Sequence, residues 1–431
     1  MKIIQYENLR SSDLRKYQEI DGEVLNRVSM IIDEVRKKGD AALLKYSRIY
    51  DRCRLSTLKI NLDQEMSSLK TISKDFQKAL TMVISNIKQV AEKQFQALQS
   101  AENLKIKIEP GIYIKQKVTP IKRLGIYVPA GRYPLFSTLY MAAIPAQAAG
   151  VKDIIVCTPP DANGRVRAEI IYVASKLGIK ELYAVGGAQA VAAMAYGTET
   201  IKPVDKIVGP GNIYVTAAKK LVFGRTGIDF IAGPTELLIM ADDSVQPEKV
   251  AADLLAQAEH DIQAKPMLIT FSRKMAESVK NALKHQLREI PTAPVAGEAL
   301  QRNGLIIICS RLQEAADLAN ELAPEHLSLF IKNPQKIINK LHNFGCLFLG
   351  EYSGEVFGDY SAGTNHILPT NGASRYTGGL SVIDFLKFTS ILKITRKGAN
   401  KIARATMLLA EREGLKGHAR SAAWRLTKLN I

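Results

Sequence analysis

Two pairs of polar side chains could support chemistry, and the first lies in the segment DLLAQAEHD, residues 253–261. Apolar residues at helical spacing predict that this segment ends a helix that begins near Pro247. Gln257 and His260 are three residues apart, so they lie on neighbouring turns. A carboxamide and an imidazole at this spacing could share a metal ion or a polar substrate. The alternative is a structural pair, a buried glutamine beside a histidine whose hydrogen bonds are made within the protein, because short motifs match by chance.

The second pair, Glu325 and His326, follows a helix that Pro324 terminates in the sequence APEHL. Adjacent side chains on extended backbone point to opposite faces, so the acid and the imidazole would serve different steps. An unperturbed histidine titrates near pH ~6.5, which suits a general base at neutral pH. A solvent-exposed loop pair is the alternative.

A long glycine-rich loop holds further candidates. The sequence FGDYSAGTNH, residues 357–366, carries Asp359 and His366 and is too long for a simple turn. Glu413 and His418 follow in the basic C-terminal region. Four of the six histidines therefore fall in the stretches that hold candidate site residues.

Two joints of small residues, GGAQ at 186–189 and GPGN at 209–212, lie between an expected strand and an expected helix. Small residues there let a phosphate approach the backbone and the helix N-terminus. Neither joint matches GxGxxG, so the usual dinucleotide fingerprint is absent. Ordinary strand-to-helix turns fit these matches equally well.

Strand and helix patterns alternate along most of the chain, which predicts an α/β fold with mostly parallel sheets. Residues 1–50 are expected to be helical, and a long helix over residues 64–100 is expected to break near Ser73. The expected strands cover residues 104–108, 112–118, 124–128, 153–157, 182–185, 206–208, 236–241, 266–270, 305–309, 327–331 and 346–349.

A break at Gly233-Pro234-Thr235 separates two runs of alternation and predicts two Rossmann-like domains, one inserted into the other. Helical extensions are expected at both ends. The expected parts are an N-terminal arm at 1–25, a first α/β domain at 26–128 and 236–379, a second α/β domain at 129–235 and a helical C-terminal extension at 380–431.

Composition narrows the class of protein. The first residues are interrupted by charges and no apolar run is long enough for a bilayer, so we expect a soluble, cytoplasmic protein. Four scattered cysteines argue against a disulfide framework and a thiolate zinc site. The formal net charge of +17 could attract any polyanion, including a dinucleotide. We find no nucleic-acid-binding motif and favour a solvated basic face.

Taken together, the motifs resemble the histidinol dehydrogenase family, in the family's order and over nearly the whole chain. The matching stretches are GIYVPAGRYPLFST, VGGAQA, VGPGN, AGPTELLI, DLLAQAEHD, APEHL, GDYSAGTNHILPT and EGLKGHARS. The resemblance implies oxidation of L-histidinol to L-histidine through bound L-histidinal. It also implies two hydrides passed to two NAD molecules, one zinc ion per site and a place at the end of histidine biosynthesis.

The resemblance assigns roles to individual residues. His326 corresponds to the base that removes the alcohol proton, and Glu325 to the residue that activates water to hydrate the aldehyde. The implied metal ligands are Gln257, His260, Asp359 and His418. The implied substrate contacts are Thr235, Gln257, His260, His326, Asp359, Glu413 and His418. The implied NAD contacts are Tyr127, Gln189 and Asn212, and the second domain is expected to bind NAD.

Two positions depart from the family's pattern. Thr235 stands where serine is common and keeps the hydroxyl, and Arg132 stands where a small residue is frequent and could favour a cofactor phosphate. The resemblance also implies an intertwined homodimer in which the C-terminal arm brings His418 to the partner's metal. The main alternative is a paralogous zinc- and NAD-dependent dehydrogenase of another small polar alcohol, and a basic nucleic-acid-binding protein is the alternative from a different class.

Overall fold

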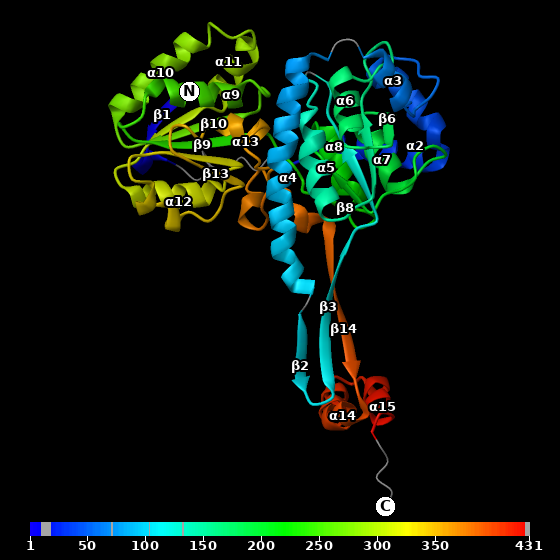
Figure 1. Cartoon of the computed structure of the whole chain (residues 1–431). Helices are drawn as coiled ribbons and strands as arrows, with labels where there is room; N and C mark the ends of the chain where they lie inside the picture. Colours follow the sequence, from blue (N-terminus) through cyan, green and yellow to red (C-terminus); the bar gives the residue numbers. More distant parts are fainter. Residues whose placement is uncertain (10–18, 70–71, 103, 132, 427–431) are drawn as a thin grey trace, which may run out of the picture.

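The computed structural model describes residues 1–9, 19–69, 72–102, 104–131 and 133–426. In this part of the chain, two parallel β-sheets are each covered by helices on both faces (Figure 1). A narrow arm of three antiparallel strands extends from them and ends in two helices (Figure 1). The expected α/β class with mostly parallel sheets is confirmed.

The five-stranded sheet has the order β6-β5-β4-β7-β8, with all neighbours parallel. Its strands are β4 (Arg123–Tyr127), β5 (Asp153–Thr158), β6 (Glu181–Ala184), β7 (Lys206–Val208) and β8 (Gly227–Ile228). The chain runs outward from β4 to β6 and returns on the other side of β4 at β7. The order therefore reverses between β4 and β7, which is where doubly wound sheets bind ligands at the carboxyl ends of their strands.

Helices cover both faces of this sheet because alternate strand residues are apolar on both sides. One face carries α4 (Lys74–Glu102), α5 (Ser137–Ala148) and α6 (Ala168–Lys176), and the other carries α2 (Gly22–Tyr46), α7 (Gly187–Tyr196) and α8 (Ile213–Val222). A π-helical turn, η2 (Ser47–Asp51), extends α2. A separate helix, α3 (Leu62–Ser68), precedes α4 and confirms the expected break near Ser73.

The six-stranded sheet has the order β1-β11-β10-β9-β12-β13, again with all neighbours parallel. Its strands are β1 (Lys2–Gln5), β9 (Glu236–Ala241), β10 (Lys265–Thr270), β11 (Leu305–Ile308), β12 (His326–Phe330) and β13 (Cys346–Leu349). Without the edge strand β1, this order repeats that of the five-stranded sheet. Its reversal lies between β9 and β12.

Helices α9 (Pro247–Ala258), α10 (Arg273–Gln286) and α11 (Ala293–Arg302) pack on one face of the six-stranded sheet, and α12 (Leu312–Leu322) packs on the other. A short helix, α13 (Glu355–Tyr360), contacts α9. Because α9 connects two parallel strands, it runs antiparallel to them, and its last turn lies near the amino ends of the strands. The remaining short helices are η1 (Tyr6–Asn8), η3 (Pro334–Lys336), η4 (Ile338–Lys340), η5 (Ala373–Arg375) and η6 (Val382–Phe385).

A short linker connects the two sheets. Residues 229–235 leave the carboxyl end of β8 and enter the amino end of β9. Gly233 N, in this linker, donates to Thr370 Oγ1 over 2.5 Å, and Asn365 Nδ2 donates to Met141 O of α5 over 2.7 Å. The carboxyl edge of the five-stranded sheet is therefore joined directly to the amino edge of the six-stranded sheet.

The first 128 residues are distributed differently from the expected domain division. β4 pairs within the five-stranded sheet, α2 packs on α7 and α8, and α4 packs on α5, although residues 26–128 were expected with the other sheet. β1 joins the edge of the six-stranded sheet, although residues 1–50 were expected to be helical. Parallel pairing of β1 with β11 outweighs the local helical pattern. Residues 10–18 of the expected N-terminal arm lie outside the described residues.

The arm consists of β2 (Lys105–Glu109), β3 (Ile112–Pro120) and β14 (Leu386–Ile394), followed by α14 (Arg396–Arg412) and α15 (Lys416–Ala423). The strand β14 was missed by the sequence analysis, which expected helices throughout residues 380–431. Figure 1 shows α14 and α15 at the tip of the arm, away from both parallel sheets. Large apolar side chains are exposed along it: Ile106, Ile108, Tyr113, Phe388, Ile391, Leu392, Ile394, Leu408, Leu409, Leu415 and Trp424.

Two further expectations concern the chain as a whole. All four cysteines are free, as expected from their scattered positions. Among the described residues, we find no helix with the length and apolar character that crossing a bilayer requires.

Candidate active site

The amino ends of β9 and β12 bring together residues that are far apart in the sequence. These strands are parallel neighbours, with His326 opposite Leu237. Thr235 and Glu325 immediately precede the two strands, so they lie side by side at this sheet edge. Thr235 Oγ1 donates a hydrogen bond to Glu325 Oε2 over 2.5 Å.

Glu325 is buried, and its carboxylate is held by the neighbouring strand. Its Oε2 also accepts from Glu236 N over 2.9 Å. Burial raises the pKa of Glu325 to about 7, and the opposing influence of His326 and of the two hydrogen bonds keeps it from rising further. A carboxyl group with this pKa can hold or release a proton near neutral pH.

His326 is buried between two carboxyl groups. Its Nδ1 donates to Glu236 O over 3.2 Å and lies 3.7 Å from Glu325 Oε2. Its Nε2 lies 3.4 Å from Asp359 Oδ1 and makes no hydrogen bond within the described part of the chain. Burial alone lowers the pKa of His326, but Glu325 and Asp359 outweigh it and raise this pKa to about 10.

Gln257 lies on the last turn of α9 and is fully buried. With its amide nitrogen toward Glu355, it donates to Glu355 Oε1 over 3.2 Å, and its oxygen accepts from Glu236 N over 3.2 Å. In this orientation the amide oxygen also accepts from Thr235 Oγ1, whose single proton is shared with Glu325 Oε2. The end of α9 is therefore tied to the same strand edge that carries Thr235 and Glu325.

Two acidic residues of this cluster were missed by the sequence analysis. Glu355 is buried at the start of α13, and burial, together with Asp359 and Asp253, raises its pKa well above the ordinary value, which His326 opposes. Burial also raises the pKa of Asp253 to about 6. Glu355 could have been found from the sequence, because it lies four residues before Asp359 and hence on the same side of a helix.

Asp359, His366 and His260 border the same cluster. Burial raises the pKa of Asp359, but His326 outweighs it, and the net pKa is lowered. His366 Nδ1 donates to Asp359 O over 2.8 Å. His260, two residues beyond α9, is exposed and interacts electrostatically with Asp359. Gln257 and these residues therefore come from α9 and from the segment around α13, which contact each other.

Glu413 and His418 are not near this cluster in the same chain. Glu413 ends α14 and His418 lies on α15, both exposed at the tip of the arm (Figure 1). Among the described residues, no group of three or more His, Cys, Asp and Glu side chains is placed to hold a metal ion. A single chain therefore brings together only part of the predicted ligand set.

The three predicted NAD contacts lie at the carboxyl edge of the five-stranded sheet. Tyr127 ends β4, is buried and accepts through its hydroxyl from Gly187 N over 3.1 Å, and burial raises its pKa to about 12. Gln189 is buried in the first turn of α7. Asn212 is exposed and caps α8. Its Oδ1 accepts from Tyr214 N over 3.0 Å and from Val215 N over 3.1 Å.

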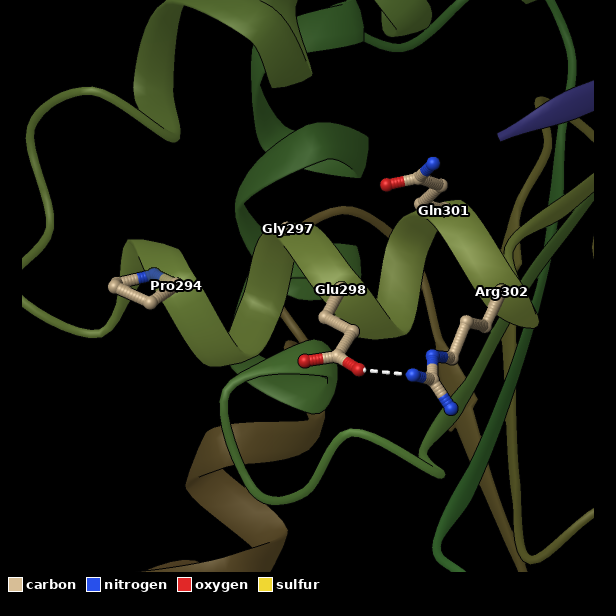
Figure 2. Close-up of a pocket in the computed structure, with 5 residues that line it drawn as sticks. All are labelled: Pro294, Gly297, Glu298, Gln301 and Arg302. Atoms are coloured by element: carbon tan, nitrogen blue, oxygen red, sulfur yellow. Dashed lines mark ion pairs between the residues drawn. The ribbon is translucent and has the colours of Figure 1, made fainter.

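One residue and one surface hollow do not contribute to the site described here. Arg132, the predicted departure near the NAD edge, lies outside the described residues. Figure 2 shows a hollow along α11 where Glu298 and Arg302 form an ion pair at 2.5 Å. The residues lining it are Pro294, Gly297, Glu298, Gln301 and Arg302, all on this one helix. It contains none of the predicted residues, so we do not assign chemistry to it.

A doubly wound sheet can bind a dinucleotide where its strand order reverses, and the buried carboxyl–imidazole cluster at the junction can transfer protons, so the arrangement suits an α/β oxidoreductase. The sequence profile described as histidinol dehydrogenase matches residues 14–426. The chain belongs to the histidinol dehydrogenase family, a family of oxidoreductases of histidine biosynthesis.

Individual relatives match over nearly their full length. The chain is 42% identical over 427 residues to histidinol dehydrogenase of Methanothermobacter thermautotrophicus, which covers 99% of both chains. It is 43% identical to the Lactiplantibacillus plantarum enzyme, with 98% of both chains covered. The crystal structure of histidinol dehydrogenase from Elizabethkingia anophelis matches with a TM-score of 0.92 at 36% identity, covering 100% of this chain and 99% of that one.

Proposed function

We propose that this protein oxidises L-histidinol to L-histidine through a bound L-histidinal intermediate, with two NAD molecules accepting one hydride each. The observation that carries the proposal is the buried Thr235–Glu325–His326 cluster at the junction of the two sheets. Family membership supports the substrate. We include a cytoplasmic location in the proposal, because the reaction draws on NAD.

Glu325 and His326 would divide the proton transfers. As the alcohol loses a hydride, His326 would take its hydroxyl proton through Nε2, the ring nitrogen that has no hydrogen-bond partner among the described residues. An aldehyde yields a second hydride readily only after water has added, and Glu325, with a pKa of about 7, would take a proton from that water. His326 would again act as the base when the hydrate loses its hydride. The base role requires a neutral ring, whereas Glu325 and Asp359 both raise the pKa of His326. A metal ion that engaged Asp359 would remove one of these two influences.

The residues of the cluster fit a zinc ion. Gln257, His260 and Asp359 supply amide, imidazole and carboxylate donors, and His418 would complete the set; nitrogen and oxygen donors of this kind suit zinc and also admit cobalt or manganese. Zinc, when bound, would orient the substrate's imidazole and amine. Thr235, through its hydroxyl, and Glu413 would contact the substrate as well.

NAD would bind at the carboxyl edge of the five-stranded sheet. The strand order reverses between β4 and β7, and Tyr127 and Asn212 lie on the two sides of that reversal. Gln189 lies on α7 beside them. We therefore propose the five-stranded sheet as the NAD-binding domain and the six-stranded sheet as the metal and catalytic domain.

A homodimer with shared sites would supply the missing ligands. His418 and Glu413 lie at the tip of an arm whose strands and helices expose many apolar side chains. Such a surface requires a partner, because large exposed apolar patches mark interaction sites. We propose that the arm packs against a second copy of this chain and delivers both residues to that copy's cluster.

Stoichiometry tests the reaction. Each L-histidinol consumed should give two NADH, and each L-histidinal supplied should give one. A panel of other small polar alcohols should give little NADH, which would exclude the paralogous dehydrogenase. One NADH per histidinol, or faster turnover of another alcohol, would contradict the proposal.

A further inference from the structure

A buried ion pair lies beneath the GPGN joint of residues 209–212, and the proposed reaction does not use it. Lys219 is on α8, and Asp229 follows β8. The Lys219 Nζ and Asp229 Oδ1 atoms form the pair, and the two side chains are only 2% and 0% exposed. The two residues thus connect α8 with the start of the linker between the sheets.

The pair holds both polar backbone groups of one residue, Gly209. Gly209 N donates to Asp229 Oδ2 over 2.8 Å, and Lys219 Nζ donates to Gly209 O over 3.0 Å. Asp229 Oδ1 also accepts from Phe230 N over 2.8 Å. Gly209 has a φ of 114°, and a Cβ atom at this position would collide with Tyr127 O. Gly209 is therefore fixed against the end of β4 as well.

A buried ion pair is a poor means of gaining stability, because the desolvation of both charges offsets most of their attraction. Apolar side chains of similar volume would stabilise the fold equally well or better. The value of this pair lies in its geometry. It ties the first residue of the joint, Gly209, to the helix whose N-cap is the last residue of the joint, Asn212.

We infer that Lys219 and Asp229 are positioning residues for dinucleotide binding. They hold the joint 209–212 so that Asn212 and the first turn of α8 meet the NAD molecule in a fixed geometry. The inference rests on the proposed function, which places NAD at this edge. Because the pair is neutral overall, it attracts phosphate little and acts through the shape of the joint.

Three variants test this role: Lys219→Met, Asp229→Asn and the double variant. Without the ion pair the joint must be ordered when NAD binds, and this ordering reduces the net binding free energy, so we expect Lys219→Met to raise the KM for NAD by about tenfold or more. Asp229→Asn keeps an acceptor for Gly209 N and should have a smaller effect. The double variant leaves no unpaired buried charge. The kcat at saturating NAD and the KM for histidinol should stay within about twofold of the wild-type values.

A matched control lies at the opposite edge of the same sheet. Arg123 begins β4, is buried and pairs with Asp153 and with Glu181, the latter at 2.8 Å. Arg123→Met removes two partly buried ion pairs from the same domain, so it should lower the thermal unfolding midpoint. The KM for NAD should not change. An equal rise in that KM would assign both pairs to general stability and overturn the inference.

The dependence of the thermal unfolding midpoint on NAD concentration gives a readout that needs no turnover. Folded Lys219→Met should require about tenfold more NAD than the wild type for the same stabilisation, and Asp229→Asn should require a smaller excess. Wild-type NAD dependence in folded variants would overturn the inference, as would failure of all three variants to fold. If the wild type reduced no NAD with histidinol, the proposed function would fail. If the wild type reduced NAD and the variants showed the same KM for NAD and the same NAD dependence, only the inference would fail.

Discussion

The two parallel sheets share one strand order but use opposite edges. In the five-stranded sheet, the predicted NAD contacts Tyr127 and Asn212 lie at the carboxyl ends of β4 and β7, where the order reverses. In the six-stranded sheet, Thr235 and Glu325 precede the amino ends of β9 and β12, the two strands at the corresponding reversal. The same topology therefore carries the predicted NAD contacts at the carboxyl edge of one sheet and the buried carboxyl–imidazole cluster at the amino edge of the other.

The linker explains why opposite edges are needed. Residues 229–235 run from the carboxyl end of β8 to the amino end of β9, so these two edges lie at one junction. Because the linker joins a carboxyl edge to an amino edge, the carboxyl edge of the six-stranded sheet lies at the end of that sheet away from the junction. A cofactor at one edge and a substrate at the other could thus meet, which hydride transfer requires.

Metal removal should have the largest effect on the acid–base edge. Prolonged chelation should abolish activity, and zinc, cobalt or manganese should restore it, because these metals accept nitrogen and oxygen donors. NAD affinity at the other sheet should survive chelation, as measured by the dependence of the unfolding midpoint on NAD. Full turnover in protein shown by elemental analysis to be metal-free would exclude the metal assignment.

Changes to the acid–base pair should separate its two roles. His326→Asn should slow both oxidations and Glu325→Gln chiefly the oxidation of L-histidinal, each by about 10²–10⁴-fold, since such groups typically contribute this much. Single-turnover rates with L-histidinol and L-histidinal measure the two steps. The KM for NAD should stay near the wild-type value in both variants. Equal damage to both steps by Glu325→Gln would contradict the division of roles.

The dimer can be tested by complementation between chains. His418→Ala and His260→Ala should each be inactive as pure dimers. A mixed dimer keeps one intact site, formed by the His260 of one chain and the His418 of the other. Unfolding equal amounts together and refolding them should therefore restore about a quarter of all sites, given random pairing.

An exposed histidine outside the cluster provides the control for complementation. His342→Ala should be active alone, and refolding it with His418→Ala should restore no more activity than dilution predicts. Verified mixed dimers that remain inactive would mean that His418 acts within its own chain.

Much of this arrangement could be predicted from the sequence. The strands 236–241 and 346–349 were expected at the residues where β9 and β13 lie, because short apolar runs between glycine-rich joints are typical of buried strands. The position of Glu325 before β12 was also expected. Its partners were not, because the pairing of β12 with β9 depends on strand order, which local patterns do not encode.

Other features escaped prediction for specific physical reasons. The strand β14 lies in a basic segment next to helices, and its pairing with β3 joins residues far apart in the sequence. Glu355 precedes a segment that was expected to be a loop, so its helical spacing from Asp359 was overlooked, and its chemical character comes from burial beside Asp359 and Gln257. The buried Lys219–Asp229 pair looks like two ordinary surface charges until the fold encloses it.

The smallest expected effect concerns a half-buried carboxyl group on the NAD side of the comparison. Burial raises the pKa of Asp51, in η2, to about 6, and Ser47 opposes the rise. Unlike Glu325, whose Oε2 accepts two hydrogen bonds, Asp51 has an Oδ2 atom without a hydrogen-bond partner in the described part of the chain. The folded chain therefore holds a proton on Asp51 at pH values where the unfolded chain has lost it. Ionisation of Asp51 costs stability progressively as the pH rises from about 4 to about 6, and the full cost remains above that range.

Asp51→Asn removes this titration, so its stability relative to the wild type should increase with pH. The gain should grow by on the order of 1 kcal/mol between pH 5 and pH 8, after allowance for solvent screening of a half-buried group. Thermal unfolding midpoints at fixed protein concentration measure it. Asp161→Asn serves as the control, because Asp161 accepts from Asn163 N and Arg165 N, both over 2.9 Å, and its loss should not stabilise the chain at any pH. A pH-independent difference for Asp51→Asn would mean that Asp51 is ionised throughout this pH range. Of the two carboxyl groups compared here, only Glu325 would then have a raised pKa.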